Sequence, residues 1–143
     1  MKIYIATDHA GVVIKDDVKN MLDNLECKVI DLGPQTTDRV NYTDFAHDLS
    51  NKVLEDIGSF GILICGTGIG MSLAANKHSG IRAALCHDAY TAQMARKHND
   101  ANILCFGQRV VGLGTIESML EAWVKTEFAG GRHATRVELI EKF

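Results

Sequence analysis

Several features that would place this chain in a membrane, nucleic-acid-binding or secreted class are missing from its sequence. No apolar run approaches the roughly 18–20 residues that a membrane-spanning helix requires. The chain begins directly with a strand-like pattern, without the apolar stretch and cleavage site of a signal peptide. The formal net charge of −3 disfavours a general nucleic-acid binder, because such proteins are usually basic. We therefore expect a cytoplasmic protein that engages neither membranes nor nucleic acids.

Closely spaced cysteines are also missing. The four thiols, Cys27, Cys65, Cys86 and Cys105, include no Cys-x-x-Cys pair of the kind used for metal or redox sites. All except Cys65 lie within apolar, strand-like segments, where a thiol behaves as a small hydrophobic side chain. Disulfides are uncommon in chains that are not exported. We expect four reduced thiols.

What the sequence does contain is the length and composition of one ordinary domain, with 143 residues, 46% of them hydrophobic and 23% charged. Apolar strand-like runs alternate with helical patterns along the whole chain. Strands are predicted at residues 2–7, 27–32, 60–65, 82–86 and 102–106. This alternation predicts a single domain over residues 1–143: a doubly wound, five-stranded parallel sheet of the Rossmann or flavodoxin type. We predict the strand order 2-1-3-4-5, with helices on both faces.

The helices are indicated by apolar residues that recur on one face. The first carries Ile14, Val18, Met21, Leu22 and Leu25, and the second carries Ala46, Leu49, Val53 and Ile57. Further helices are predicted after residue 70, over 88–98 and over about 115–127. A helical tail is predicted for about residues 130–143, after the Gly130-Gly131 pair, and we expect it to dock on a partner subunit.

A glycine-rich turn, residues 66–70, follows the third predicted strand and leads into a helix. Alternating glycines let the backbone approach a ligand closely, and a helix N-terminus favours negative charge. The spacing matches neither the dinucleotide-binding fingerprint nor the P-loop. On this pattern alone, an anion-binding loop and a ligand-free tight turn remain equally good interpretations.

Cys65 stands at the start of this turn and favours a functional interpretation. Backbone amides and a helix terminus beside a cysteine stabilise its thiolate form. A thiolate next to N–H donors can remove a proton adjacent to a carbonyl while the donors stabilise the resulting enediolate, without a metal or a cofactor. The alternative is that Cys65 is simply the last buried residue of a strand.

Other polar residues give weaker signals. Asp8 and His9 follow the first strand at the same edge of the sheet, but Asp8 suits a helix N-cap equally well. Arg132 and Arg136 are four residues apart, which suits a phosphate group, although a solvated basic face is the commoner reason for such spacing. Arg109, after the fifth strand, is a candidate third phosphate contact. By default, His98 is a structural residue at a helix C-terminus.

Seven segments together resemble the type B ribose-5-phosphate isomerases, within the family that also contains galactose- and allose-6-phosphate isomerases. They run in family order over nearly the whole chain: DHAG (8–11), GILICGTGIG (61–70), AANK (74–77), GIRA (80–83), RKHND (96–100), FGQRVVG (106–112) and GGRHATRV (130–137). One branch of the family replaces the cysteine with a glutamate just after the loop. Met71 and Ser72 stand there in this chain, so the cysteine mechanism is the one implied.

The resemblance implies an aldose–ketose isomerase that interconverts ribose 5-phosphate and ribulose 5-phosphate, with allose or galactose 6-phosphate as alternative substrates. It implies that Cys65 transfers the proton, that His98 opens the sugar ring, and that Thr67 and the loop amides stabilise the enediolate. The substrate-binding residues it implies are Asp8, His9, Gly66, Thr67, Gly68, Ile69, Gly70, Asn99, Arg109, Arg132 and Arg136. From another class of function, a sugar-phosphate-binding module without catalysis remains the alternative, although it would need neither Cys65 nor His98.

The topology adds a prediction of its own. Each helix of a parallel α/β fold runs back across the sheet, so His98 should lie at the amino edge and Cys65 at the carboxyl edge. A strand of five or six residues separates these edges by ~17–20 Å. We therefore expect a homodimer in which His98 and Asn99 complete the partner's site, or a dimer of such dimers.

Overall fold

Five parallel strands form the central sheet of the computed structural model, which describes all 143 residues. They are β1 (Lys2–Thr7), β2 (Lys28–Asp31), β3 (Phe60–Cys65), β4 (Ala83–Leu85) and β5 (Ile103–Gly107). Along β1, β3 and β5 nearly every residue is buried. This continuous burial is typical of parallel strands that are covered by helices on both faces.

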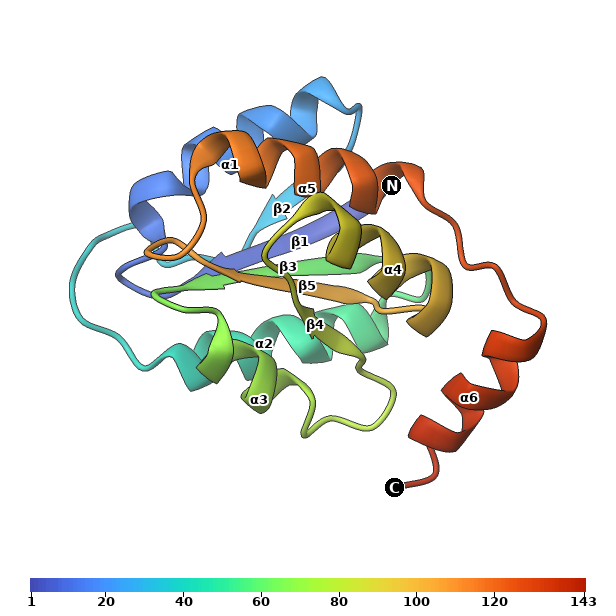
Figure 1. Cartoon of the computed structure of the whole chain (residues 1–143). Coiled ribbons are helices and arrows are strands. Elements are labelled where there is room, and N and C mark those ends of the chain that lie inside the picture. Colours follow the sequence, from blue (N-terminus) through green and yellow to red (C-terminus); the bar gives the residue numbers. More distant parts are fainter.

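Helices cover both faces of this sheet (Figure 1). On one face lie α1 (Val12–Asn24), α4 (Ala89–Asn99) and α5 (Leu113–Lys125), and on the other lie α2 (Tyr42–Glu55) and α3 (Ile69–Ala75). The last helix, α6 (Arg132–Ile140), lies apart from both layers, at the end of a long connection from α5 (Figure 1). None of these helices combines the length and apolar character needed to cross a membrane.

The sheet separates two hydrophobic cores, because successive side chains along each strand point to opposite faces. Ile3 and Ile5 of β1 face α1, α4 and α5, while Tyr4 and Ala6 face α2 and α3. The residues of the predicted apolar helix faces are buried or half-buried against the cores, with one exception. Because α2 ends at Glu55, Ile57 lies beyond the helix and is 95% exposed.

The predicted doubly wound parallel sheet is confirmed, but the predicted strand order is wrong at one end. The observed order is β2-β1-β3-β5-β4, so β5 pairs with β3 and β4 forms the edge. The burial of the two strands explains the exchange. All five residues of β5 are buried, whereas β4 has only three residues, each half-buried, and therefore suits the edge of the sheet.

A buried lysine fixes the connection between β2 and α2. Lys15 of α1 is only 2% exposed, and its Nζ contacts the carboxylate of Asp31 at 3.1 Å and donates to the carbonyl of Pro34. Lys19 Nζ binds the other carboxylate oxygen of Asp31 at 3.1 Å, and the Gly33 N–H also donates to Asp31. Partial burial alone would raise the pKa of Asp31, but these hydrogen bonds and the lysine charges outweigh it and lower the pKa.

Replacing Lys15 by methionine should therefore destabilise the fold, because Asp31 loses its buried cation and keeps only Lys19 and the Gly33 N–H, while the Pro34 carbonyl loses its side-chain donor. We expect Lys15→Met to lower the free energy of unfolding by about 3 kcal/mol. The matched control is Lys52→Met, whose ion pair with Glu55 is exposed at both ends and should contribute less than about 0.5 kcal/mol. Urea unfolding of the two variants tests this, and equal midpoints would contradict it.

Candidate active site

The loops after β1, β3 and β5 meet at the carboxyl edge of the sheet. The Asp8 N–H donates to the carbonyl of Ile64 at 3.0 Å, which joins the first loop to the end of β3. The Gln108 N–H donates to the carbonyl of Cys65 at 2.9 Å, and the Arg109 N–H donates to that of Gly66 at 3.0 Å. These bonds bring Asp8, Arg109 and the glycine-rich loop together, as expected for parallel strands.

The side chain of Cys65 is held beneath the glycine-rich loop. Its sulfur accepts a hydrogen bond from the Gly68 N–H at 3.0 Å, and the residue is 5% exposed. Gly68 has a φ of +79°, in the left-handed region that favours glycine. A Cβ at this position would also lie 2.7 Å from the backbone of Phe106. The glycine therefore allows the loop to fold back so that its amide reaches the sulfur.

Two polar groups lie on the outer side of this loop. Thr67 is exposed, and its Oγ1 accepts a hydrogen bond from the Ile69 N–H at 3.2 Å, which leaves its own hydroxyl proton available to donate. The guanidinium of Arg109 lies over Gly66, with Nη1 3.4 Å from the place where a Cβ of Gly66 would stand. Gly70 packs against the ring of Tyr42, the first residue of α2. A cation and a hydroxyl thus lie close to Cys65.

Asp8 and His9 occupy the neighbouring loop. Asp8 Oδ1 accepts hydrogen bonds from the N–H groups of Ala10 at 2.9 Å and Gly11 at 3.0 Å. The N-cap of α1 is Gly11, so Asp8 stabilises the turn before the helix and does not cap the helix itself. The Val40 N–H donates to His9 Nδ1 at 3.3 Å. Because Nδ1 accepts this bond, a neutral His9 carries its proton on Nε2.

The remaining predicted site residues lie at the opposite edge of the sheet. The Gly61 N–H, in the first part of β3, donates to the carbonyl of Asn102, just after α4, at 2.9 Å. The end of α4, with His98 and Asn99, therefore lies at the amino edge, whereas Cys65 ends β3 at the carboxyl edge (Figure 1). Five residue steps along β3 correspond to ~17 Å. One chain alone therefore does not bring His98 to Cys65.

Two histidines and two arginines gather at this amino edge. The ring of His98 stacks on that of His133, with centroids 4.2 Å apart and planes inclined by 10°. Arg132 and Arg136 are exposed on the same helix, α6. Partial desolvation and then the nearby charges of His98, Arg132, Arg136 and Lys97 lower the pKa of His133. The cluster suits an anionic ligand.

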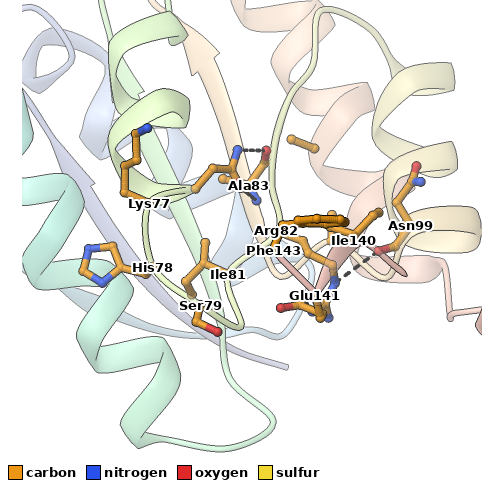
Figure 2. A pocket seen from close by; sticks show the side chains of 13 residues that line it. Lys77, His78, Ser79, Ile81, Arg82, Ala83, Asn99, Ile140, Glu141 and Phe143 are labelled. Carbon is orange, nitrogen blue, oxygen red and sulfur yellow. Dashed lines mark hydrogen bonds and ion pairs between the residues drawn. The ribbon is translucent and has the colours of Figure 1, made fainter. Parts of the chain in front are cut away.

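A cavity of about 470 Å³ also opens at the amino edge (Figure 2). It lies between the connection from α3 to β4, the end of α4 and the end of the chain after α6. Of the predicted site residues, only Asn99 lines it. No group of three or more His, Cys, Asp or Glu side chains is arranged to hold a metal ion.

Two residues that support the end of α4 were missed by the sequence analysis. Arg96 is 6% exposed, stacks 4.6 Å from the ring centroid of Phe60, and donates to the carbonyl of Ala101 and to Asp100. Asp100 has a φ of +46° and ends the helix. Both stand in the RKHND segment, but a buried arginine beneath a helix end has no signal in helical periodicity.

Comparison with known proteins agrees with the resemblance seen in the sequence. The ribose/galactose isomerase family model matches residues 3–140. Ribose-5-phosphate isomerase B of Escherichia coli K12 is 43% identical over 139 residues, covering 97% of this chain and 93% of that protein. The solved structure of Clostridium thermocellum ribose-5-phosphate isomerase B has a TM-score of 0.95 and 47% identity, over 99% of this chain and 96% of the other. The structure of Trypanosoma brucei type B ribose 5-phosphate isomerase has a TM-score of 0.95 and 41% identity, and the match covers 98% of this chain and 96% of the other.

The close packing of the glycine-rich loop generates a prediction about Gly107. A Cβ at Gly107 would lie 2.5 Å from backbone atoms of Thr67 and 2.6 Å from the carbonyl of Gly66. We expect Gly107→Ala to displace the loop and to lower the free energy of unfolding by about 2 kcal/mol. As the matched control, Gly114→Ala in α5 meets no atom within 4 Å and should stabilise the protein by up to about 1 kcal/mol. Urea unfolding measures both changes, and wild-type stability of Gly107→Ala would show that the loop is loosely packed.

Proposed function

The chain belongs to the ribose/galactose isomerase family, and from this premise we propose that it interconverts ribose 5-phosphate and ribulose 5-phosphate. Its family makes it a sugar-phosphate isomerase, and several relatives at 41–47% identity carry the name ribose-5-phosphate isomerase B or type B. The observation that carries the proposal is the contact at 3.0 Å between the Cys65 sulfur and the Gly68 N–H. It gives the base of the proposed reaction a hydrogen-bond donor that stabilises negative charge.

In the proposed mechanism the open-chain sugar lies beside the glycine-rich loop. The Cys65 thiolate removes the proton from C2. The electrons of the C2–H bond form the C1–C2 double bond of a cis-enediolate while the π electrons of the C1 carbonyl move to O1. Thr67 and the amides of residues 66–70 stabilise the oxygen anion. Cys65 then returns the proton to C1 while the hydroxyl proton on O2 passes to O1, so that C2 becomes the carbonyl of the ketose. No electron acceptor is consumed.

The second part of the proposal is that two subunits share each site. Cys65, Thr67, Asp8, His9 and Arg109 lie at the carboxyl edge, whereas His98, Asn99, Arg132 and Arg136 lie at the amino edge of the same chain. A two-fold dimer brings the first set of one subunit against the second set of its partner, and it creates two equivalent sites. There the partner's His98 opens the furanose ring and Asn99 of the partner subunit contacts the sugar. Arg109 of the first subunit, with the partner's Arg132 and the partner's Arg136, binds the phosphate. Docking of residues 130–143 on the partner belongs to the same proposal.

A reducing, cytoplasmic setting is consistent with this chemistry and is also part of the proposal. All four cysteines are buried and unpaired. An oxidising compartment would expose the essential thiolate to oxidation, whereas the cytosol keeps such thiols reduced.

The substrate assignment is tested by assaying the purified protein side by side on ribose 5-phosphate, allose 6-phosphate and galactose 6-phosphate, with and without a chelator. We expect ribose 5-phosphate to react fastest and the chelator to have no effect. Cys65→Ser should lower kcat by about 10²–10⁴-fold, because a hydroxyl is a poor base. Cys27→Ala, which removes another buried thiol far from the loop, is the control and should keep wild-type kcat.

Three other results would change the assignment. Faster turnover of a six-carbon sugar phosphate would move the protein to another branch of the same family. Substrate binding without turnover would favour a sugar-phosphate-binding module. Normal turnover by Cys65→Ser would show that another group is the base.

The shared site is tested by mixing two inactive variants, Cys65→Ala and His98→Ala, under conditions of subunit exchange. Half of the dimers formed at equal concentrations are mixed, and each mixed dimer contains one site with both residues intact. We expect recovery of about a quarter of the wild-type activity. A mixture of Cys65→Ala with Cys65→Ser, which should recover none, is the control. No recovery in the first mixture would contradict the shared site.

A further inference from the structure

The C-terminal arm, residues 126–143, carries Arg132 and Arg136 at the amino edge but has little hydrophobic attachment to its own chain. No residue of α6 is buried, and Leu139, Ile140 and Phe143 are each at least half exposed. A short helix without buried apolar side chains is not held in place by its own sequence. Within its own chain, the position of Arg132 and Arg136 therefore depends on a few specific contacts.

Those contacts occur at the two ends of the arm. Near its start, the Ala129 N–H donates to the carbonyl of Lys97 at 3.0 Å, and the ring of His133 stacks on His98. At its end, Glu141 binds Arg82 Nη1 at 2.6 Å through Oε1 and accepts the Gly80 N–H at 3.1 Å through Oε2. Both oxygens of one carboxylate thus hold the arm to the connection between α3 and β4.

Arg82 is the residue through which this attachment reaches the end of α4. Its Nε donates to the carbonyls of Asn99 at 3.2 Å and Asp100 at 3.0 Å, and its Nη2 lies 3.4 Å from the Asp100 carboxylate. The guanidinium thus contacts the arm on one side and the helix end on the other. Figure 2 shows Arg82 beside the cavity, between Asn99 and Glu141. Asp100 is held in turn by the buried Arg96 at 3.0 Å.

We propose that Arg82 is a positioning residue that couples the two groups of side chains at the amino edge into one rigid unit. Through Glu141 it fixes the arm with Arg132 and Arg136, and through Asn99 and Asp100 it fixes the end of α4 with His98. The inference rests on the proposed function, in which these residues enter the partner's site together. The planar, five-donor guanidinium suits this role, because it binds two carbonyls and two carboxylates at once.

Loosening this link should affect phosphate binding more than chemistry. Without the Arg82–Glu141 contact the arm samples several positions, so binding the phosphate must first order it. Cys65 and the glycine-rich loop lie at the other edge of the sheet and keep their geometry. The expected signature is a higher KM for ribose 5-phosphate, and a higher inhibition constant for inorganic phosphate, at nearly constant kcat.

The test compares Glu141→Gln with the matched control Glu138→Gln, which makes the same change of charge at an exposed residue of α6 without an ion pair. Hydrogen exchange of the α6 amides in the ligand-free protein reports the position of the arm independently of activity. We expect faster exchange in Glu141→Gln and wild-type exchange in the control. For this partly buried ion pair we expect KM and the phosphate inhibition constant to rise by about threefold to fivefold, with kcat changed less than about twofold.

A second variant, Arg82→Lys, keeps the charge but cannot reproduce the fork of hydrogen bonds. It should raise KM in the same direction, and adding it to Glu141→Gln should produce less than the product of the two separate effects. Unchanged α6 exchange in Glu141→Gln would overturn the link itself. Faster exchange with unchanged KM would overturn its positioning role. If the wild-type protein fails to convert ribose 5-phosphate, the proposed function is wrong, while the exchange measurement still decides whether Arg82 holds the arm.

Discussion

The parallel direction of all five strands is the constraint on which the rest of this structure depends. Since every strand points the same way, every loop that follows a strand lies at one edge, and every helix end lies at the other. Cys65 ends β3 and His98 ends α4, so the fold itself separates them. The same rule gathers Asp8, the glycine-rich loop and Arg109 without any long insertion. The geometry of the site is thus a direct consequence of strand direction.

At the carboxyl edge, close backbone packing replaces long side chains as the means of building the site. Gly68 and Gly107 allow the loop after β3 to press against the end of β5, where any Cβ would collide with main-chain atoms. The loop thereby points the Gly68 amide at the Cys65 sulfur. Buried charge supports the next loop in a similar way, since Lys15 and Asp31 hold the start of the connection whose end reaches His9. Rigid main chain and a few well-placed polar contacts position this half of the site.

The amino edge is built differently. Its predicted site residues stand on a helix end and on an arm whose helix has no buried residue, and ionic and stacking contacts hold them together. Such contacts contribute less to stability than apolar burial, because the cost of removing charged groups from water offsets much of their attraction. They do specify orientation, through the fixed geometry of guanidinium groups and carboxylates. An arm of this kind can adapt to a partner subunit more readily than the closely packed loop at the other edge.

The amino-acid sequence by itself determined the class of fold, the position of most strands and helices, the family and the division of the predicted site residues between two edges. The fold class and the elements follow from periodicity and glycine placement, which are local properties of the chain, and the division between edges follows from the parallel sheet that they imply. The family follows from the resemblance of seven motifs in the same order. Only the tertiary structure decided that β5 lies between β3 and β4 in the sheet. It also decided that Lys15 is buried on an otherwise apolar helix face, and that Arg82 pairs with Glu141, 59 residues further along the chain. Each of these depends on which surfaces become buried and which charged groups pair in the folded chain. The residues involved are far apart in the sequence, so no local periodic pattern predicts their contact.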